Sequence, residues 1–332
     1  MHTGRRYRIR EVLLWTRRRA LILLVHSFVP VALYDWLGWK WLAIPWPVVA
    51  MLGTATAFIV GFKNTQSYNR AWEARQIWGS IMNASRAWAA MTNGYLPHDP
   101  ELVRDLVRRH LAWVAALRYQ LREPRAWESM VEPQNQEYRE RWFEVPEMVT
   151  PVEVELAKFL GEEELAGVLK TKNRATQIMG LQSALVGRLA ETGKLDSVRH
   201  VALQEAITSH YDAQGRAERI KNTPYPRQFA TANGMFVKLF ATLLPFGLLK
   251  EFSALAPNNP YCVWLVVPFS VIVSWIFTTL EQVGDSTENP FEGGPNDVPM
   301  AQLQRAMEID MLEMIGETEL PPAIRPTHDI LL

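Results

Sequence analysis

Four long stretches of nearly uncharged sequence constrain this chain more than any other feature. They cover residues 20–39, 41–62, 235–256 and 263–280. An α-helix rises about 1.5 Å per residue, so roughly 20 apolar residues cross a hydrocarbon core of about 30 Å. Within each pair the stretches are close neighbours, separated by Lys40 in the first and by a Pro- and Asn-rich turn at 256–261 in the second. The sequence therefore predicts two transmembrane helical hairpins.

Charged residues near these stretches predict their orientation. Residues 1–19 contain seven arginines and the second stretch is followed by Lys63, whereas the opposite turns carry only Lys40 or no basic residue. Basic residues favour the cytoplasmic side, so we expect a multi-pass protein of the plasma (inner) membrane with both termini in the cytoplasm. A cleaved signal peptide fits less well, because a second span follows the first at once. The third stretch holds Lys238, Lys250 and Glu251, so a buried helix of a soluble domain is an alternative there.

Residues 63–234 contain no comparable apolar stretch and have the pattern of amphipathic helices. Asp99-Pro100-Glu101 is a typical helix start, and further helices are expected at 176–191, 197–220 and, in the tail, 300–315. No alternating strand pattern of any length is present. We predict an all-α fold in five parts: an N-terminal segment (1–19), a first transmembrane hairpin (20–62), a cytoplasmic helical domain (63–234), a second hairpin (235–280) and a cytoplasmic C-terminal segment (281–332).

Composition argues against several classes of function. Thirty-five basic and 35 acidic residues give no net charge, which is atypical of a nucleic-acid binder. The single Cys262 allows no intrachain disulfide, and neither metal-ligand spacing nor a nucleophile motif is present. His200 and His210 are expected on solvated helix faces. We therefore expect no enzyme, although a membrane enzyme acting on lipid is a remaining alternative.

The second stretch has a regular face. Thr54, Phe58 and Phe62 recur every four residues and share one side of a helix, beside small residues that allow close helix packing in lipid. Periodicity alone favours a face that packs on a neighbouring helix. The alternative is a face that lines a pore between identical subunits, where apolar rings form a constriction. Beyond Phe62 the sequence becomes polar at once but keeps an apolar stripe, which predicts one long helix leaving the membrane.

Two motifs over 200 residues apart resemble a known family. The first is Gly61-Phe62-Lys63-Asn64, followed by Ser67-Tyr68-Asn69-Arg70-Ala71-Trp72-Glu73-Ala74-Arg75 and Trp78-Gly79. The second is Glu281-Gln282, then Glu288-Asn289-Pro290-Phe291 and Asn296-Asp297-Val298-Pro299. Together they resemble the bestrophins, especially the prokaryotic members, over essentially the whole chain. The resemblance marks these family-motif residues: Asn64, Arg70, Glu73, Arg75, Asn289, Pro290, Phe291 and Asp297.

The resemblance implies a homopentameric channel with one axial pore, so the expected partners are further copies of the chain, the lipid bilayer and small inorganic ions. The family's narrow neck carries over to Thr54, Phe58 and Phe62. Thr54 stands where the family usually has Ile, and its hydroxyl should hydrate more easily. A second, cytoplasmic constriction best matches Leu195 in Gly193-Lys194-Leu195-Asp196.

The resemblance also bears on calcium and on the permeant ion. Animal bestrophins carry a dense acidic run after Asn-Pro-Phe that binds calcium, whereas residues 292–297 here have far fewer carboxylates. The acidic segment 281–297 also lacks EF-hand spacing, so we expect no cofactor and no metal, with a calcium site as the alternative. An apolar neck discriminates weakly among ions of one sign. We favour a chloride-channel-like function; the alternatives are a monovalent-cation channel of the same fold and a non-conducting membrane scaffold.

Overall fold

The structure is a computed structural model that describes residues 1–255 and 259–332. Its larger elements are α1 (Ile9–Trp36), α2 (Trp46–Tyr95), α3 (Pro100–Arg122), α8 (Arg174–Glu191), α9 (Ser197–Asn222), α10 (Arg227–Leu255), α11 (Val266–Asp285) and α12 (Met300–Met314). Short helices lie between them: η1 (Lys40–Leu42), η2 (Ser129–Val131), α4 (Pro133–Trp142), α5 (Pro146–Val149), α6 (Val152–Leu156), α7 (Glu162–Leu169) and η3 (Pro260–Leu265). Among the described residues the only strand-like pairings are isolated bridges near the termini, which confirms the all-α prediction.

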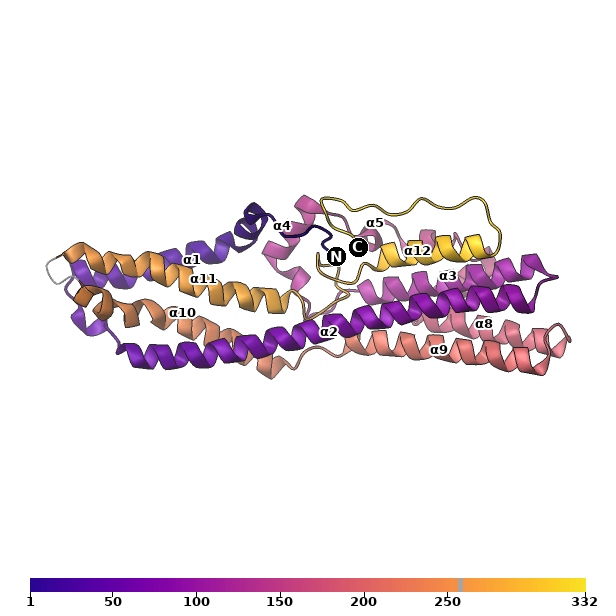
Figure 1. The fold of residues 1–332 in the computed structure, drawn as a ribbon, viewed down its shortest axis with the longest axis horizontal. Helices are drawn as coiled ribbons and strands as arrows, with labels where there is room; N and C mark the ends of the chain where they lie inside the picture. The colour runs from indigo at the N-terminus through magenta and orange to yellow at the C-terminus, as the bar shows by residue number, and fades with distance from the viewer. Residues whose placement is uncertain (256–258) are drawn as a thin grey trace.

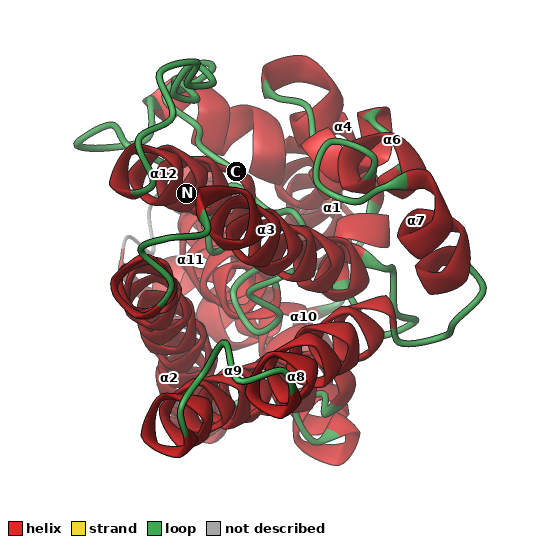
Figure 2. Cartoon of the chain, turned by 90° about the vertical axis from the view of Figure 1, so that its right-hand side faces the viewer, coloured by secondary structure: helices red, strands yellow, loops and turns green. Residues whose placement is uncertain are grey.

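The molecule is elongated, with two helical regions that follow one another end to end along its long axis (Figure 1). At one end, α1, the first part of α2, α10 and α11 form a bundle that we call the four-helix end. These four helices are long and apolar enough to cross a membrane. At the other end, α3, α9 and α12 pack against one side of the second part of α2 and, together with α8, form the helical body (Figure 2). Of the turn expected at 256–261, residues 256–258 lie outside the described part of the chain.

Helix α2 joins the two regions without interruption. It contains 50 residues and is therefore about 75 Å long. The first half of α2 packs against α10 and α11, and the second half packs against α9, α12 and α3. One helix thus passes from the four-helix end into the helical body, as the apolar stripe beyond Phe62 predicts.

The core of the helical body is built around α3. From His110 to Leu117 every residue of this helix is buried, because α2, α6, α8, α9 and α12 pack around it. Trp78, Trp88 and Trp113 are fully buried in the same core. Asp99 accepts a hydrogen bond from the Leu102 amide and caps the helix, as expected.

His210 lies in the core of the helical body and not on the solvated helix face that was expected from the sequence. Its side chain is fully buried, with its ring 4.6 Å from that of His110 and 5.2 Å from the Trp113 ring. The prediction of a solvated face was wrong because α9 is covered by α2 on one side and α8 on another. Burial lowers the pKa of His210 to about 4 and holds the pKa of His110 well below its usual value. His200 is half-buried.

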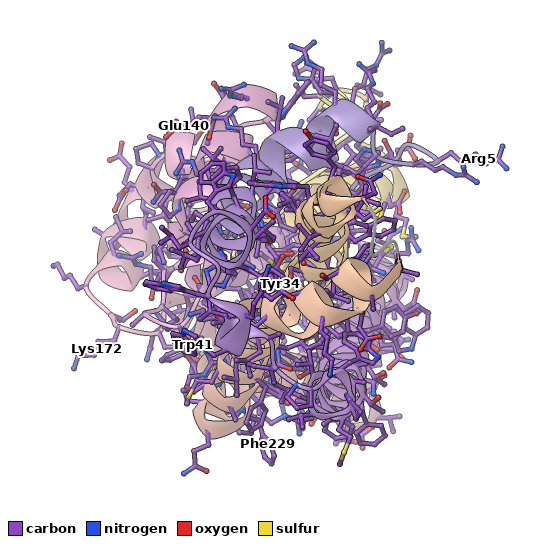
Figure 3. All side chains as sticks on the ribbon, turned by 90° about the vertical axis from the view of Figure 1, so that its left-hand side faces the viewer. Arg5, Tyr34, Trp41, Glu140, Lys172 and Phe229 are labelled. Atoms are coloured by element: carbon purple, nitrogen blue, oxygen red, sulfur yellow. The ribbon has the colours of Figure 1, made fainter. Side chains whose placement is uncertain are left out.

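Helix α1 begins at Ile9, well before the apolar stretch that starts at residue 20. Side chains of α4 hold this early segment: Asn135 accepts from Trp15 Nε1 at 2.7 Å, and the Tyr138 hydroxyl donates to Glu11 at 3.0 Å. Viewed from the four-helix end, Arg5 just before α1 extends away from the molecule, on the side opposite Lys172 (Figure 3).

Candidate ion-conducting surface

Thr54, Phe58 and Phe62 lie on one exposed line of α2. Phe58 is 77% exposed and Phe62 is 52% exposed in the single chain. Large apolar side chains in such positions mark a surface that meets lipid, another subunit or a pore. The Thr54 hydroxyl donates to the Ala50 carbonyl oxygen at 3.0 Å, so its proton is used within the helix. Its lone pairs remain available to water.

The exposed line continues down the whole of α2 and carries no charge. The exposed residues from Met51 onward are all apolar or neutral polar: Met51, Thr54, Ala55, Ala57, Phe58, Gly61, Phe62, Thr65, Tyr68, Asn69, Trp72, Gln76, Gly79, Ser80, Asn83, Ala87, Ala90, Asn93 and Gly94. We call this set the neutral line. Every charged side chain of α2 is engaged by another element instead: Lys63 by Asp285, Arg70 by backbone carbonyls, Glu73 by Arg219, Arg75 by Asn296 and Arg86 by Asp310.

The two family motifs meet in space. Arg70 donates from Nε to the Glu288 carbonyl oxygen at 2.8 Å and from Nη2 to the Ile220 carbonyl oxygen at 3.0 Å. Arg75 Nη2 donates to the carbonyl oxygen of Asn296 at 3.1 Å. Burial lowers the pKa of Arg70. These arginines fasten the segment after α11 to α2, which gives the shared motif a structural role.

The segment 288–297 is itself closely packed. Asn289 and Pro290 are buried, and Phe291 is fully buried in the core of the helical body. Asp297 accepts hydrogen bonds from the amides of Gly293 at 2.8 Å and Gly294 at 2.9 Å, and so holds the turn in which Gly293 has a φ of +92°. Asn64 of α2 faces the last turn of α11, just before this segment, because a Cβ placed on Gly284 would lie 2.5 Å from the Asn64 Oδ1.

The carboxylates of this segment are bonded to internal donors, which does not fit a calcium site. Glu292 accepts from the Ser129 hydroxyl at 2.6 Å and from the Met130 amide at 3.2 Å. Arg122 Nη1 lies 3.7 Å from Asp297 Oδ2, where its charge disfavours a second cation. Burial raises the pKa of Glu292 well above its usual value, and burial also raises that of Asp297 despite the opposing effect of Arg122. Among residues 1–255 and 259–332, no cluster of three or more His, Cys, Asp or Glu has the arrangement of a metal site.

Arg122 is the residue of this region that the sequence analysis missed. It comes from the end of α3, donates to the Phe291 carbonyl oxygen at 2.9 Å and contacts Glu147 at 3.3 Å. A lone arginine in the last turn of a helix is common in solvent-exposed helices, so nothing in its local sequence indicates burial. Only the packing of α3 at the centre of the body reveals it.

Leu195 is almost fully buried in the core of the helical body, with 3% of its surface exposed. Its side chain is therefore not part of the exposed surface of the single chain. Val198, in the first turn of α9, is the nearest large apolar residue that is exposed, at 77%.

Comparison with known proteins supports these observations. Residues 9–313 match the family described as bacterial/fungal bestrophin protein. The chain is 29% identical to the voltage-dependent anion channel-forming protein YneE of Escherichia coli strain K12, over 93% of this chain and 89% of that protein. It is 27% identical to the voltage-dependent anion channel-forming protein RSc3414 of Ralstonia nicotianae, over 82% and 78%.

The fold also matches a solved structure. A bacterial bestrophin homologue from Klebsiella pneumoniae superposes with a TM-score of 0.77 at 24% identity, covering 91% of this chain and 99% of that one. This likeness establishes the fold, with its four apolar helices. Because the family model extends over more than nine-tenths of the sequence, the chain belongs to the bacterial and fungal bestrophin family.

Proposed function

We propose that this protein is a passive, non-enzymatic anion channel that forms a homopentamer around one axial pore. The names of the E. coli and Ralstonia relatives support an anion-conducting function. The observation that carries the proposal is the line of Thr54, Phe58 and Phe62, which the described residues of the single chain leave exposed. In a ring of subunits with α2 innermost, these side chains would form successive rings.

The chemistry of those rings determines how the pore works. Phenyl rings offer no ligands to replace the hydration shell of an ion, so a neck of this kind conducts hydrated or partly hydrated ions and gates by dewetting. Thr54 offers hydroxyl lone pairs, so water enters at its level more easily than at Phe58. Below the neck, the neutral line would form the wall of a vestibule. Because this wall carries no charge, the electrostatic field in the vestibule would come from residues outside α2.

A second constriction at the cytoplasmic end of the body is part of the proposal. The resemblance points to Leu195, but that side chain is buried, whereas Val198, three residues on, is the more exposed of the apolar residues Val198 and Val201 that follow it. We therefore assign the cytoplasmic aperture to Val198.

The orientation proposed for the chain follows its charges. With the helical body in the cytoplasm, the seven arginines of residues 1–19 and Lys63 lie on the cytoplasmic side of the plasma membrane. Both termini lie on that side, because they sit next to each other beside the helical body (Figure 1). For this topology we retain the five parts expected from the sequence, with boundaries after residues 19, 62, 234 and 280.

The test is conductance of the purified protein in a planar bilayer under a KCl gradient. We expect a current that reverses near the chloride equilibrium potential and changes in size or gating in Phe58→Ala. The matched control is Leu21→Ala, which shortens an exposed apolar side chain on α1. Reversal near the potassium potential would replace the anion proposal with a cation channel, and absence of current from folded pentamers would favour a scaffold. A stable monomer would contradict the axial pore.

A further inference from the structure

One cavity of the chain lies where the four-helix end meets the helical body. It has a volume of about 640 Å³ and lies between α1, α10, α11 and the segment 126–135. This volume is typical of ligand sites. Figure 1 shows α4, which follows this segment, at the level where α1 leaves the four-helix end. In the proposed orientation, the cavity therefore spans the cytoplasmic boundary of the membrane.

The two ends of the cavity differ in chemistry. Toward the four-helix end it is lined by aliphatic side chains, including Ile22, Leu23 and Ala241. Toward the helical body it is lined by charged groups of both signs. The basic ones are Arg19, Arg227 and Lys238, and the acidic ones are Glu128, Glu132, Glu281, Asp285 and Glu288. An amphiphile with a charged end matches this division, whereas a simple ion does not.

Several polar groups that line the cavity have no partner. Gln282 is 2% exposed, and both its Nε2 and its Oε1 lack a hydrogen bond within the described residues. The Nε1 of Trp127 and the Oε2 of Glu288 are likewise without partners among those residues. Buried polar atoms are normally paired, because an unpaired one costs about 1–3 kcal/mol. The cavity thus presents both donors and acceptors to an occupant.

Two charged residues at the cavity, Lys238 and Glu132, are exposed in the single chain. Neither makes a side-chain ion pair or hydrogen bond with any residue in the described ranges. By contrast, Glu288 pairs through its Oε1 with Arg227 at 2.5 Å, and Arg19 donates to the Thr278 carbonyl oxygen at 3.0 Å. One unpaired cation and one unpaired anion in the same cavity are complementary to a ligand that carries both signs.

We propose that this cavity binds the headgroup of a zwitterionic phospholipid of the cytoplasmic leaflet. Its phosphate lies near Lys238 and Arg19, its ammonium lies near Glu132 and Glu288, and its first acyl carbons contact Ile22 and Ala241. Basic groups between transmembrane helices on the cytoplasmic side commonly contact the phosphates of lipid headgroups. The additional carboxylates here select an amine that can donate hydrogen bonds. The site rests on the proposed orientation and is independent of whether the channel conducts.

The test is native mass spectrometry of the purified full-chain oligomer, titrated in detergent with phosphatidylethanolamine, phosphatidylcholine and phosphatidylglycerol. We expect phosphatidylethanolamine to bind most tightly, at up to one site per subunit. Lys238→Gln should weaken its binding about tenfold, because a charge-assisted contact to the phosphate is lost. The matched control is Lys250→Gln, an exposed lysine at the opposite end of the same helix.

A second variant separates binding from folding. Gln282→Leu removes an unpaired buried amide, so we expect the thermal stability without added lipid to be retained while phosphatidylethanolamine binding falls. Equal binding of phosphatidylglycerol, or equal effects of Lys238→Gln and Lys250→Gln, would overturn the proposal. So would absence of bound lipid, or binding of soluble phosphoethanolamine but of no lipid. None of these readings depends on current, so they do not bear on the proposed channel function.

Discussion

Arg122 brings a positive charge into the closely packed contact between α3 and the segment 288–297. Its side chain is 2% exposed, as is that of Glu147, and Asp297 beside it is 1% exposed. A buried ion pair contributes little net stability by itself, but removal of one partner leaves the other charge buried and uncompensated. Arg122 therefore matters most through what its loss would leave behind.

We expect Arg122→Met to lower the free energy of unfolding by about 3 kcal/mol, since Asp297 loses the arginine beside it and Glu147 keeps only Arg118 as a cationic partner. The measurement is thermal or chemical unfolding in a fixed detergent. Arg125→Met is the control, because Arg125 contacts the more exposed Glu123 and should cost less than about 1 kcal/mol. Equal losses in the two variants would show that Arg122 is not a central contact.

The buried histidine pair predicts loss of stability in acid. His210 has an ordinary pKa of 6.5 when unfolded and about 4 when folded, so the unfolded chain binds more protons between these values. Stability is complete above about pH 6.5 and falls as the pH decreases toward 4. The shift corresponds to roughly 3 kcal/mol for His210 alone.

Replacement of His210 by Phe should reduce this acid dependence, because a phenyl ring occupies the same buried site and does not titrate. The measurement is the unfolding midpoint as a function of pH from 7.5 to 4. His200→Gln, on the same helix but half-buried, should leave the pH profile unchanged. An identical profile for His210→Phe and the native chain would exclude this histidine as the acid-sensitive group.

At the scale of residues, the sequence predicted the positions of side chains that recur with the period of a helix. Thr54, Phe58 and Phe62 share a line because four-residue spacing on a helix places them there. His210 and Arg122 could not be placed, because burial of a polar residue depends on which helices surround it. The same limit applies to Leu195, whose exposure depends on the turn between α8 and α9.

At the scale of elements, small residues determine how closely α2 approaches α10. A Cβ added to Gly53 would lie 2.7 Å from a ring carbon of Phe240, and a Cβ on Gly247 would lie 2.7 Å from the Val49 side chain. Phe240 is buried against Phe277, with ring centroids 4.7 Å apart, so it has little room to move. Contacts this close are typical of helix packing in lipid, where small residues let helices approach.

Gly53→Ala should therefore destabilise the four-helix end by about 1–3 kcal/mol through overpacking. Gly61→Ala, on the same helix, meets nothing within 4 Å and should be neutral or slightly stabilising, because alanine favours helix. The comparison of melting temperatures in one detergent tests this. If the two variants melt alike, α2 and α10 have more freedom to separate than this contact implies.

The elements themselves were predictable in proportion to their length. The four apolar stretches and the long helices α3, α8, α9 and α12 repeat an apolar period over several turns, which is a strong signal. The short helices α4, α5 and α7 have at most ten residues each and too few turns for a period to be recognised. The early start of α1 at Ile9 depends on Asn135 and Tyr138, which lie far along the chain.

At the scale of the whole molecule, the neutral line of α2 predicts how the channel would select ions. In the proposed pentamer, one charge added at Asn83 becomes a ring of five in the vestibule. Asn83→Glu should shift the reversal potential under a KCl gradient toward potassium, and Asn83→Lys should shift it further toward chloride. Both shifts should shrink at high salt, since mobile ions screen the added charge.

The control places the same charge outside the vestibule. Val154 in α6 is exposed on the far side of the helical body from α2, so Val154→Glu should leave the reversal potential unchanged. Size-exclusion chromatography should give the native oligomer for all three variants. If Asn83→Glu and Asn83→Lys shift the reversal potential in the same direction, or if neither shifts it, α2 does not line the conduction path.

Helix α2 contains no proline after its first turn, so its 50 residues form one continuous, rigid helix. A twist applied at the helical body therefore reaches the rings of Phe58 and Phe62 without being absorbed at a hinge. A rotation of about 60° would turn Phe58 and Phe62 aside and bring Gly61 and Thr65 to the same face, because residues three positions apart on a helix are offset by about 60°. A molecule that bound anywhere along the body could in this way widen a neck tens of ångströms away.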